Sequence, residues 1–116
     1  MIKKLRVGTL LLPSNVLMAP LAGYTCYPFR MLAYELGAGL CFTEMTSANG
    51  LKYQDRANCR LLLTTEKEKI KAVQLLGGVP AIMEHTACSE LLKDYHIKIG
   101  RASCRERSVH CFAEAL

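Results

Sequence analysis

The sequence predicts a mixed α/β fold in which short parallel strands alternate with helices. Three brief apolar runs lack the polar alternation of a half-exposed strand, which is typical of strands buried on both faces; they span residues 16–19, 39–43 and 72–76. A segment with helical spacing or helix-end signals follows each run. This order predicts βα units whose strands lie in one parallel sheet, joined by right-handed crossovers.

Local turn and helix signals define the elements of the first half. Residues 5–12 are expected to form an extended or hairpin segment that turns near Gly8. A helix is expected over residues 27–36, because Pro28 suits its first turn and Gly37 suits the position just past its end. Its apolar residues recur at i, i+3, i+4 and i+7 and form one stripe: Phe29, Leu32, Ala33 and Leu36.

The second half continues the same alternation. Residues 48–53 predict a short helix, whereas residues 55–63 have no clear assignment. A helix is expected to begin at Pro80, after the strand at 72–76 has ended at two glycines. Its apolar residues recur every four positions: Met83, Ala87, Leu91 and Tyr95.

Length and composition limit the class of protein. The 116 residues suit one small domain, whereas a closed eight-stranded α/β barrel needs roughly 200 residues or more. No run approaches the about 18 apolar residues of a membrane span, and the broken N-terminal run makes a poor signal peptide. The net charge of +5 is spread along the chain without a Lys/Arg cluster, so it does not by itself predict a nucleic-acid surface.

The cysteines predict neither a metal site nor a redox motif. The 6 cysteines include no CxxC pair, and the 3 histidines add no regular ligand spacing. An even number of cysteines makes a disulfide framework formally possible. Because no secretion signal is present, free thiols in a reducing cytoplasm are the favoured interpretation.

Candidate ligand-binding residues lie where the strands end, because ligands of parallel α/β folds meet the carboxyl ends of strands. Residues 20–23 would let a flat ligand lie close to the backbone, although they also suit an ordinary tight turn. Glu44 follows the second strand, where interaction with a helix N-terminus is the alternative. Gln74 is a lone amide in the third strand, which could pair with a heteroaromatic edge or with neighbouring backbone.

Five segments in this order resemble the N-terminal part of bacterial tRNA-dihydrouridine synthases. They are Ala19-Pro20-Leu21-Ala22-Gly23-Tyr24-Thr25, Pro28-Phe29-Arg30, Glu35-Leu36-Gly37-Ala38-Gly39-Leu40, Thr43-Glu44-Met45 and Val73-Gln74-Leu75-Leu76-Gly77. The resemblance covers about residues 8–97. Two positions depart from the family pattern: Leu21 stands where Met is usual, and Cys26 stands where Asp is common.

The resemblance implies a partial TIM (β/α)8 barrel, about its first three βα units, within residues 1–97. Family members reduce uridine in tRNA to 5,6-dihydrouridine with FMN and NADPH. Pro20, Leu21 and Ala22 would line the FMN ring, and Gln74 would hydrogen-bond its polar edge. The family's acid is a cysteine in a D-x-N-x-G-C-P motif that is missing here, so no catalytic residue is assigned and the chain alone is expected to be inactive. Its open strand edge is expected to favour aggregation.

Residues 98–116 are expected to be foreign to the domain. The string Ile99-Gly100-Arg101-Ala102-Ser103-Cys104-Arg105-Glu106-Arg107 resembles the in-frame translation of a sequencing-library adapter, so a native fold is not expected there. A genuine basic tail that binds RNA is the alternative. Two other functions remain open: a different FMN-dependent TIM-barrel oxidoreductase that acts on a small molecule, and a non-catalytic α/β module that binds RNA through Lys and Arg.

Overall fold

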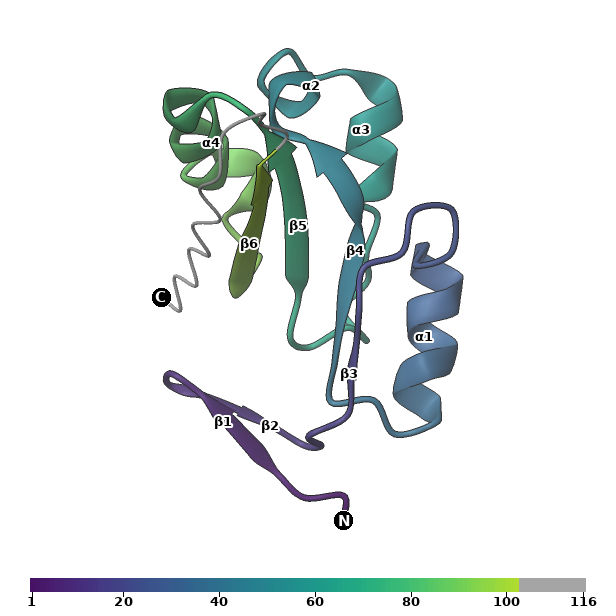
Figure 1. Ribbon diagram of the computed structural model, residues 1–116. Helices are drawn as coiled ribbons and strands as arrows, with labels where there is room; N and C mark the ends of the chain where they lie inside the picture. The colour runs from purple at the N-terminus through teal and green to yellow at the C-terminus, as the bar shows by residue number, and fades with distance from the viewer. Residues whose placement is uncertain (103–116) are drawn as a thin grey trace.

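A four-stranded parallel sheet forms the centre of the chain, and a separate two-stranded antiparallel hairpin precedes it (Figure 1). The computed structural model describes residues 1–102. The hairpin pairs β1 (Leu5–Val7) with β2 (Leu10–Leu12). The sheet has the order β3-β4-β5-β6 and comprises β3 (Leu17–Met18), β4 (Leu40–Ser47), β5 (Ala72–Gly77) and β6 (Ile97–Ala102). The mixed α/β class, the parallel sheet and the hairpin are therefore confirmed.

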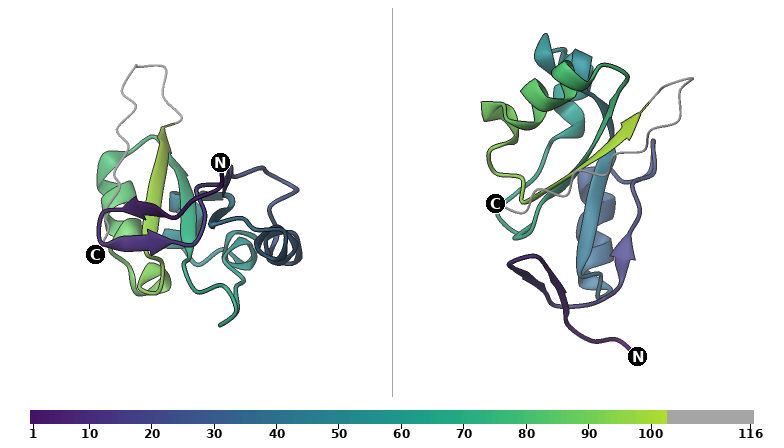
Figure 2. Two further views of the ribbon diagram at one scale, coloured as in Figure 1. Left: turned by 90° about the horizontal axis from the view of Figure 1, so that it is seen from below. Right: turned by 60° about the vertical axis from the view of Figure 1, so that its left-hand side comes forward.

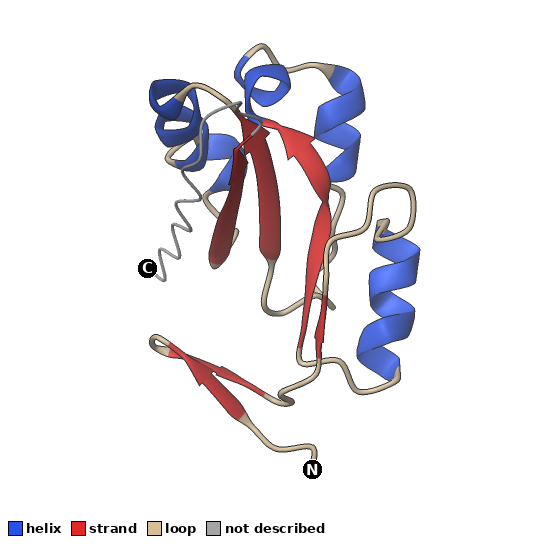
Figure 3. Cartoon of the chain, in the orientation of Figure 1, coloured by secondary structure: helices blue, strands red, loops and turns tan. Residues whose placement is uncertain are grey.

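Helices connect the successive strands, as the colouring of Figure 3 shows. They are α1 (Tyr27–Glu35), α2 (Ala48–Lys52), α3 (Arg56–Leu61), α4 (Pro80–Ala87) and the 3₁₀ turn η1 (Glu90–Leu92). α4 is shorter than the spacing of its apolar residues predicts. Just past its end, the Ser89 hydroxyl donates to the Thr86 carbonyl at 2.7 Å and so competes with backbone N–H groups for this helical acceptor. No helix within residues 1–102 is long and apolar enough to cross a membrane.

Alternate strand residues fill two apolar clusters on opposite faces of the sheet. The helix-side cluster contains Leu51, Val73, Leu75, Leu92 and Tyr95. The hairpin-side cluster contains Leu12, Leu40, Ala72 and Ile97. Figure 2 shows the hairpin crossing beneath the sheet, at the amino ends of its strands. The hairpin therefore leaves the carboxyl ends of the strands uncovered on this face.

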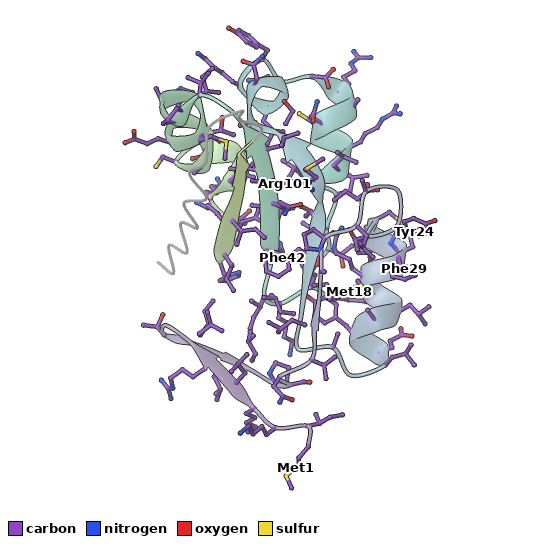
Figure 4. All side chains as sticks on the ribbon, in the orientation of Figure 1. Met1, Met18, Tyr24, Phe29, Phe42 and Arg101 are labelled. Carbon is purple, nitrogen blue, oxygen red and sulfur yellow. The ribbon has the colours of Figure 1, made fainter. Side chains whose placement is uncertain are left out.

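The apolar stripe predicted for α1 is largely exposed. Leu32 is 51% exposed and Leu36 80% exposed, while Arg30 is the buried residue of this helix. Figure 4 labels Met18 on β3 and Phe29 on α1, which help to line an apolar groove of about 360 Å³ between these two elements. The stripe is exposed because β3 has only β4 as a neighbour, and no other described segment covers this groove.

The sheet extends past the boundary expected after residue 97. All six residues of β6 pair with β5, from Ala72↔Ile97 to Gly77↔Ala102. Ile97 and Ile99 both contact the hairpin-side cluster, since side chains two residues apart share a face of a strand. Residues 98–102 are therefore part of the sheet, whereas residues 103–116, with Cys104, Arg105, Arg107 and Cys111, lie outside the described part of the chain.

Substitutions in the hairpin-side cluster and in the groove should differ sharply in their effect on the free energy of unfolding. Leu40→Ala is expected to lower the free energy of unfolding by roughly 2–5 kcal/mol, because Leu40 is fully buried in the hairpin-side cluster. Leu36→Gln should leave it nearly unchanged, because Leu36 is mostly in water. Urea denaturation of the 116-residue chain measures both. A large loss with Leu36→Gln would show that the groove is closed.

Candidate functional site

The loop after β3 is a tight turn that Thr25 closes. The Tyr24 and Thr25 backbone N–H groups donate to the Leu21 carbonyl at 3.0 and 2.9 Å, and the Leu21 N–H donates to the Thr25 hydroxyl at 3.1 Å. Gly23 has φ +79°, a conformation that side chains with a Cβ rarely adopt. Most of the loop is in water: Leu21 is half exposed, and Ala22 and Gly23 are exposed. The turn therefore presents its backbone outward at the carboxyl end of β3.

Gln74 lies on the face of the sheet opposite the helices. It is paired with Met45 of β4 and Ile99 of β6, and it shares the face of Ala72 two residues earlier. The half-buried Gln74 amide has no hydrogen-bond partner among residues 1–102, and it stays accessible to solvent. One donor and one acceptor are thus available on this face for a ligand.

The sequence pattern predicts that Glu44 lies just after the end of its strand, and this prediction is wrong because Glu44 lies inside β4. β4 continues to Ser47, and the register shifts between Phe42 and Met45, so that three steps along β4 oppose two along β5. An extra residue of this kind bends the strand and redirects a side chain. The Glu44 carboxylate accepts a hydrogen bond from the Gly23 N–H. Ser47, rather than Glu44, caps the following helix, since its hydroxyl accepts from the Gly50 N–H.

A buried ion pair lies behind the loop. Arg30 and Glu68 are 1% and 2% exposed, and the guanidinium donates to both carboxylate oxygens, from Nε at 2.8 Å and from Nη2 at 3.1 Å. Arg30 also donates to the Thr25 and Leu63 carbonyls, each at 2.8 Å. Burial alone would lower the pKa of Arg30, but the hydrogen bond and charge of Glu68 outweigh it and raise the pKa. The Arg30 guanidinium therefore stays charged, and its hydrogen bonds join α1 to the loop and to the segment before β5.

The described cysteines are free thiols, at positions 26, 41, 59 and 88. Cys41 is buried, and burial raises the pKa of its thiol to about 11, so the thiol is protonated at neutral pH. Tyr34 lies beside it: its hydroxyl accepts the Cys41 N–H at 2.9 Å and donates to the Ile70 carbonyl at 3.2 Å. No group of three or more His, Cys, Asp or Glu side chains in the described residues could hold a metal ion.

The predicted flavin-contacting residues come from two strands of the sheet that are not neighbours. Pro20, Leu21 and Ala22 follow β3, Gln74 lies on β5, and β4 separates them. Sequence reasoning missed Glu68, because its partner Arg30 is 38 residues away and a Glu in a charged segment looks like a surface residue. Arg101, assigned to the foreign tail, lies in β6 with its Nη1 3.9 Å from the Met45 sulfur (Figure 4).

Comparisons with a family model and with curated proteins point to one family. A family model described as Dihydrouridine synthase (Dus) matches residues 17–99. The tRNA-dihydrouridine synthase B of Pseudomonas aeruginosa is 34% identical over 82 residues, which cover 71% of this chain and 25% of that protein. A probable tRNA-dihydrouridine synthase of Treponema pallidum is 37% identical over 81 residues, 70% of this chain and 24% of that protein.

The tRNA-dihydrouridine synthase B of Escherichia coli strain K12 is 35% identical over 83 residues, 72% of this chain and 26% of that protein. The chain therefore spans about a quarter of the length of the curated relatives it matches. No solved structure was found to match the chain.

Removing one partner of the buried ion pair should be costly. Glu68→Gln is expected to lower the free energy of unfolding by about 3–5 kcal/mol, because it leaves the Arg30 charge buried and uncompensated. The double change Arg30→Met with Glu68→Leu should recover part of this loss. Glu90→Gln, in the exposed pair with Lys93, is the matched control and should leave the urea midpoint unchanged. Equal midpoints for Glu68→Gln and Glu90→Gln would contradict the account.

Proposed function

Because the chain belongs to the dihydrouridine synthase family, we propose that it is the FMN-binding amino-terminal part of a tRNA-dihydrouridine synthase. The complete enzyme of this proposal is cytoplasmic and reduces uridine in tRNA to 5,6-dihydrouridine, with NADPH as the reductant. The observation that supports it most is an exposed turn after one strand of a parallel sheet together with the Gln74 amide within another strand, which has no hydrogen-bond partner among residues 1–102.

The chemistry of these groups fits a flavin. A Cβ built at Gly23 would meet nothing within 4 Å, so no atom of the described chain blocks the approach of a flat ring to this side of the loop tip. The Gln74 amide can donate and accept at once, as the polar edge of the flavin ring requires. When bound, FMN supplies the hydride transfer, and the residues of this chain bind and orient it.

The fold fits part of a (β/α)8 barrel. In such a barrel every strand has a neighbour on each side, whereas β3 and β6 each have one here. We propose that about three βα units and the strand β6 are present, and that the groove between β3 and α1 receives chain that the longer relatives possess. In the chain alone, these open edges should promote aggregation.

Turnover by this chain alone is not expected. Among the described thiols, Cys41 lies on the α1 side of the sheet, with its sulfur 3.9 Å from the Arg30 carbonyl. The sheet itself separates that side from the face of Gln74. The family's cysteine motif is also missing from the sequence, so the proposed part would bind the cofactor without supplying an acid to the uracil ring.

Flavin binding to the 116-residue chain tests the proposal through the quenching of FMN fluorescence. Gln74→Leu is expected to weaken FMN binding about tenfold, the effect of losing one to two hydrogen bonds from a half-buried site. Asn49→Ala, an exposed amide on α2, is the matched control and should bind as the unaltered chain does.

Two results would contradict the proposal. One is NADPH-dependent formation of dihydrouridine in tRNA by the 116-residue chain alone at the rate of a complete enzyme. The other is salt-dependent tRNA binding with no affinity for FMN, which would instead favour a non-catalytic RNA-binding module.

A further inference from the structure

We propose that Glu44 is a positioning residue for the turn over residues 20–25, hereafter the flavin loop. The shift of register in β4 directs the Glu44 carboxylate onto the Gly23 N–H, and this hydrogen bond holds the tip of the flavin loop. The inference rests on the proposed function, because it assigns to Glu44 the task of shaping the backbone that FMN would meet.

The irregularity in β4 is built by the residues on either side of Glu44. The hydroxyls of Thr43 and Thr46 each donate to the Glu44 carbonyl at 3.0 Å. Both threonines are buried, at 1% and 0% exposure, so their side chains have little freedom to leave these bonds. The main chain at Glu44 is therefore fixed, and its side chain leaves the strand in a set direction.

The two ends of the flavin loop are held in different ways. Its last residue, Thr25, is fully buried; its hydroxyl bonds Leu21, and its carbonyl accepts from Arg30 at 2.8 Å. Its tip has no such packing, since Tyr24 is 67% exposed and points away above α1 (Figure 4). Within residues 1–102, Glu44 is the side chain that hydrogen-bonds the tip.

The nature of this bond explains why a carboxylate stands at position 44. A hydrogen bond from a backbone N–H to an ionised carboxylate is stronger than one to a neutral acceptor. Gly23 has φ +79°, and this backbone conformation determines the direction in which its N–H points. Without an acceptor at Glu44, the tip would keep only the bonds within the turn, and the flavin-facing backbone would sample other conformations.

Amide hydrogen exchange of the 116-residue chain, followed by NMR, tests this without any flavin. Glu44→Ala is expected to accelerate exchange of the Gly23 amide by roughly tenfold or more, because a bond to a charged acceptor is lost. Glu44→Gln keeps an oxygen in the same place and should restore most of the protection. The Gly37 amide, which donates to the Tyr34 carbonyl at 3.0 Å, is the internal control and should not change.

A second pair of variants guards against simple unfolding. If Glu44→Ala does not fold, Glu44→Asp keeps the charge but is one methylene shorter, so it should lose the Gly23 protection alone. Glu84→Ala, an exposed glutamate on α4, should leave both amides unchanged. Unchanged exchange at Gly23 in Glu44→Ala or Glu44→Asp would overturn the inference. FMN titration of the same variants separates the two proposals. If the Glu44 variants change exchange at Gly23 selectively but the chain binds no FMN, the positioning role of Glu44 is supported and the flavin site is refuted.

Discussion

The buried ion pair of Arg30 and Glu68 is the interaction on which the site depends. Its two charges are almost fully removed from water, so each needs the other, and their mutual hydrogen bonds fix α1 against the segment that leads into β5. Through the Thr25 carbonyl, the same guanidinium fixes the end of the flavin loop. A helix, a loop and a connection that are distant in the sequence are thereby held in one arrangement.

The face opposite the helices has fixed side chains and backbone, yet part of it is accessible to solvent. The hairpin closes its lower part with apolar side chains. The flavin loop follows β3, whereas the Glu44 carboxylate and the Gln74 amide come from within β4 and β5. Two other parts of the described chain are also uncovered: the edge strands, which each have one neighbour, and the groove beside α1, where apolar residues remain in water. A hydrogen-bonded loop beside uncovered apolar surface is what we expect in one part of a larger parallel α/β domain.

Elements with local causes were predictable from the sequence, whereas contacts between distant residues were not. Pro28 and Gly37 correctly predicted where α1 begins and ends, and the apolar runs predicted the positions of the strands, because these signals act within a few residues. The Glu44–Gly23 bond spans 21 positions and depends on a shift of register that no local pattern reveals. The apolar stripe of α1 was visible in the sequence, but what covers it was not, so Leu36, a residue of this stripe, is exposed.

The central claim is that the flavin loop and Gln74 form one flavin site. The most direct measurement is a titration of the 116-residue chain with FMN, followed by amide NMR. The account predicts that the backbone amides of Ala22 and Gly23 and the side-chain amide of Gln74 shift together with one affinity, while the amides of α4 stay in place. Shifts confined to other parts of the chain, or a Gln74 side chain that does not respond, would contradict it.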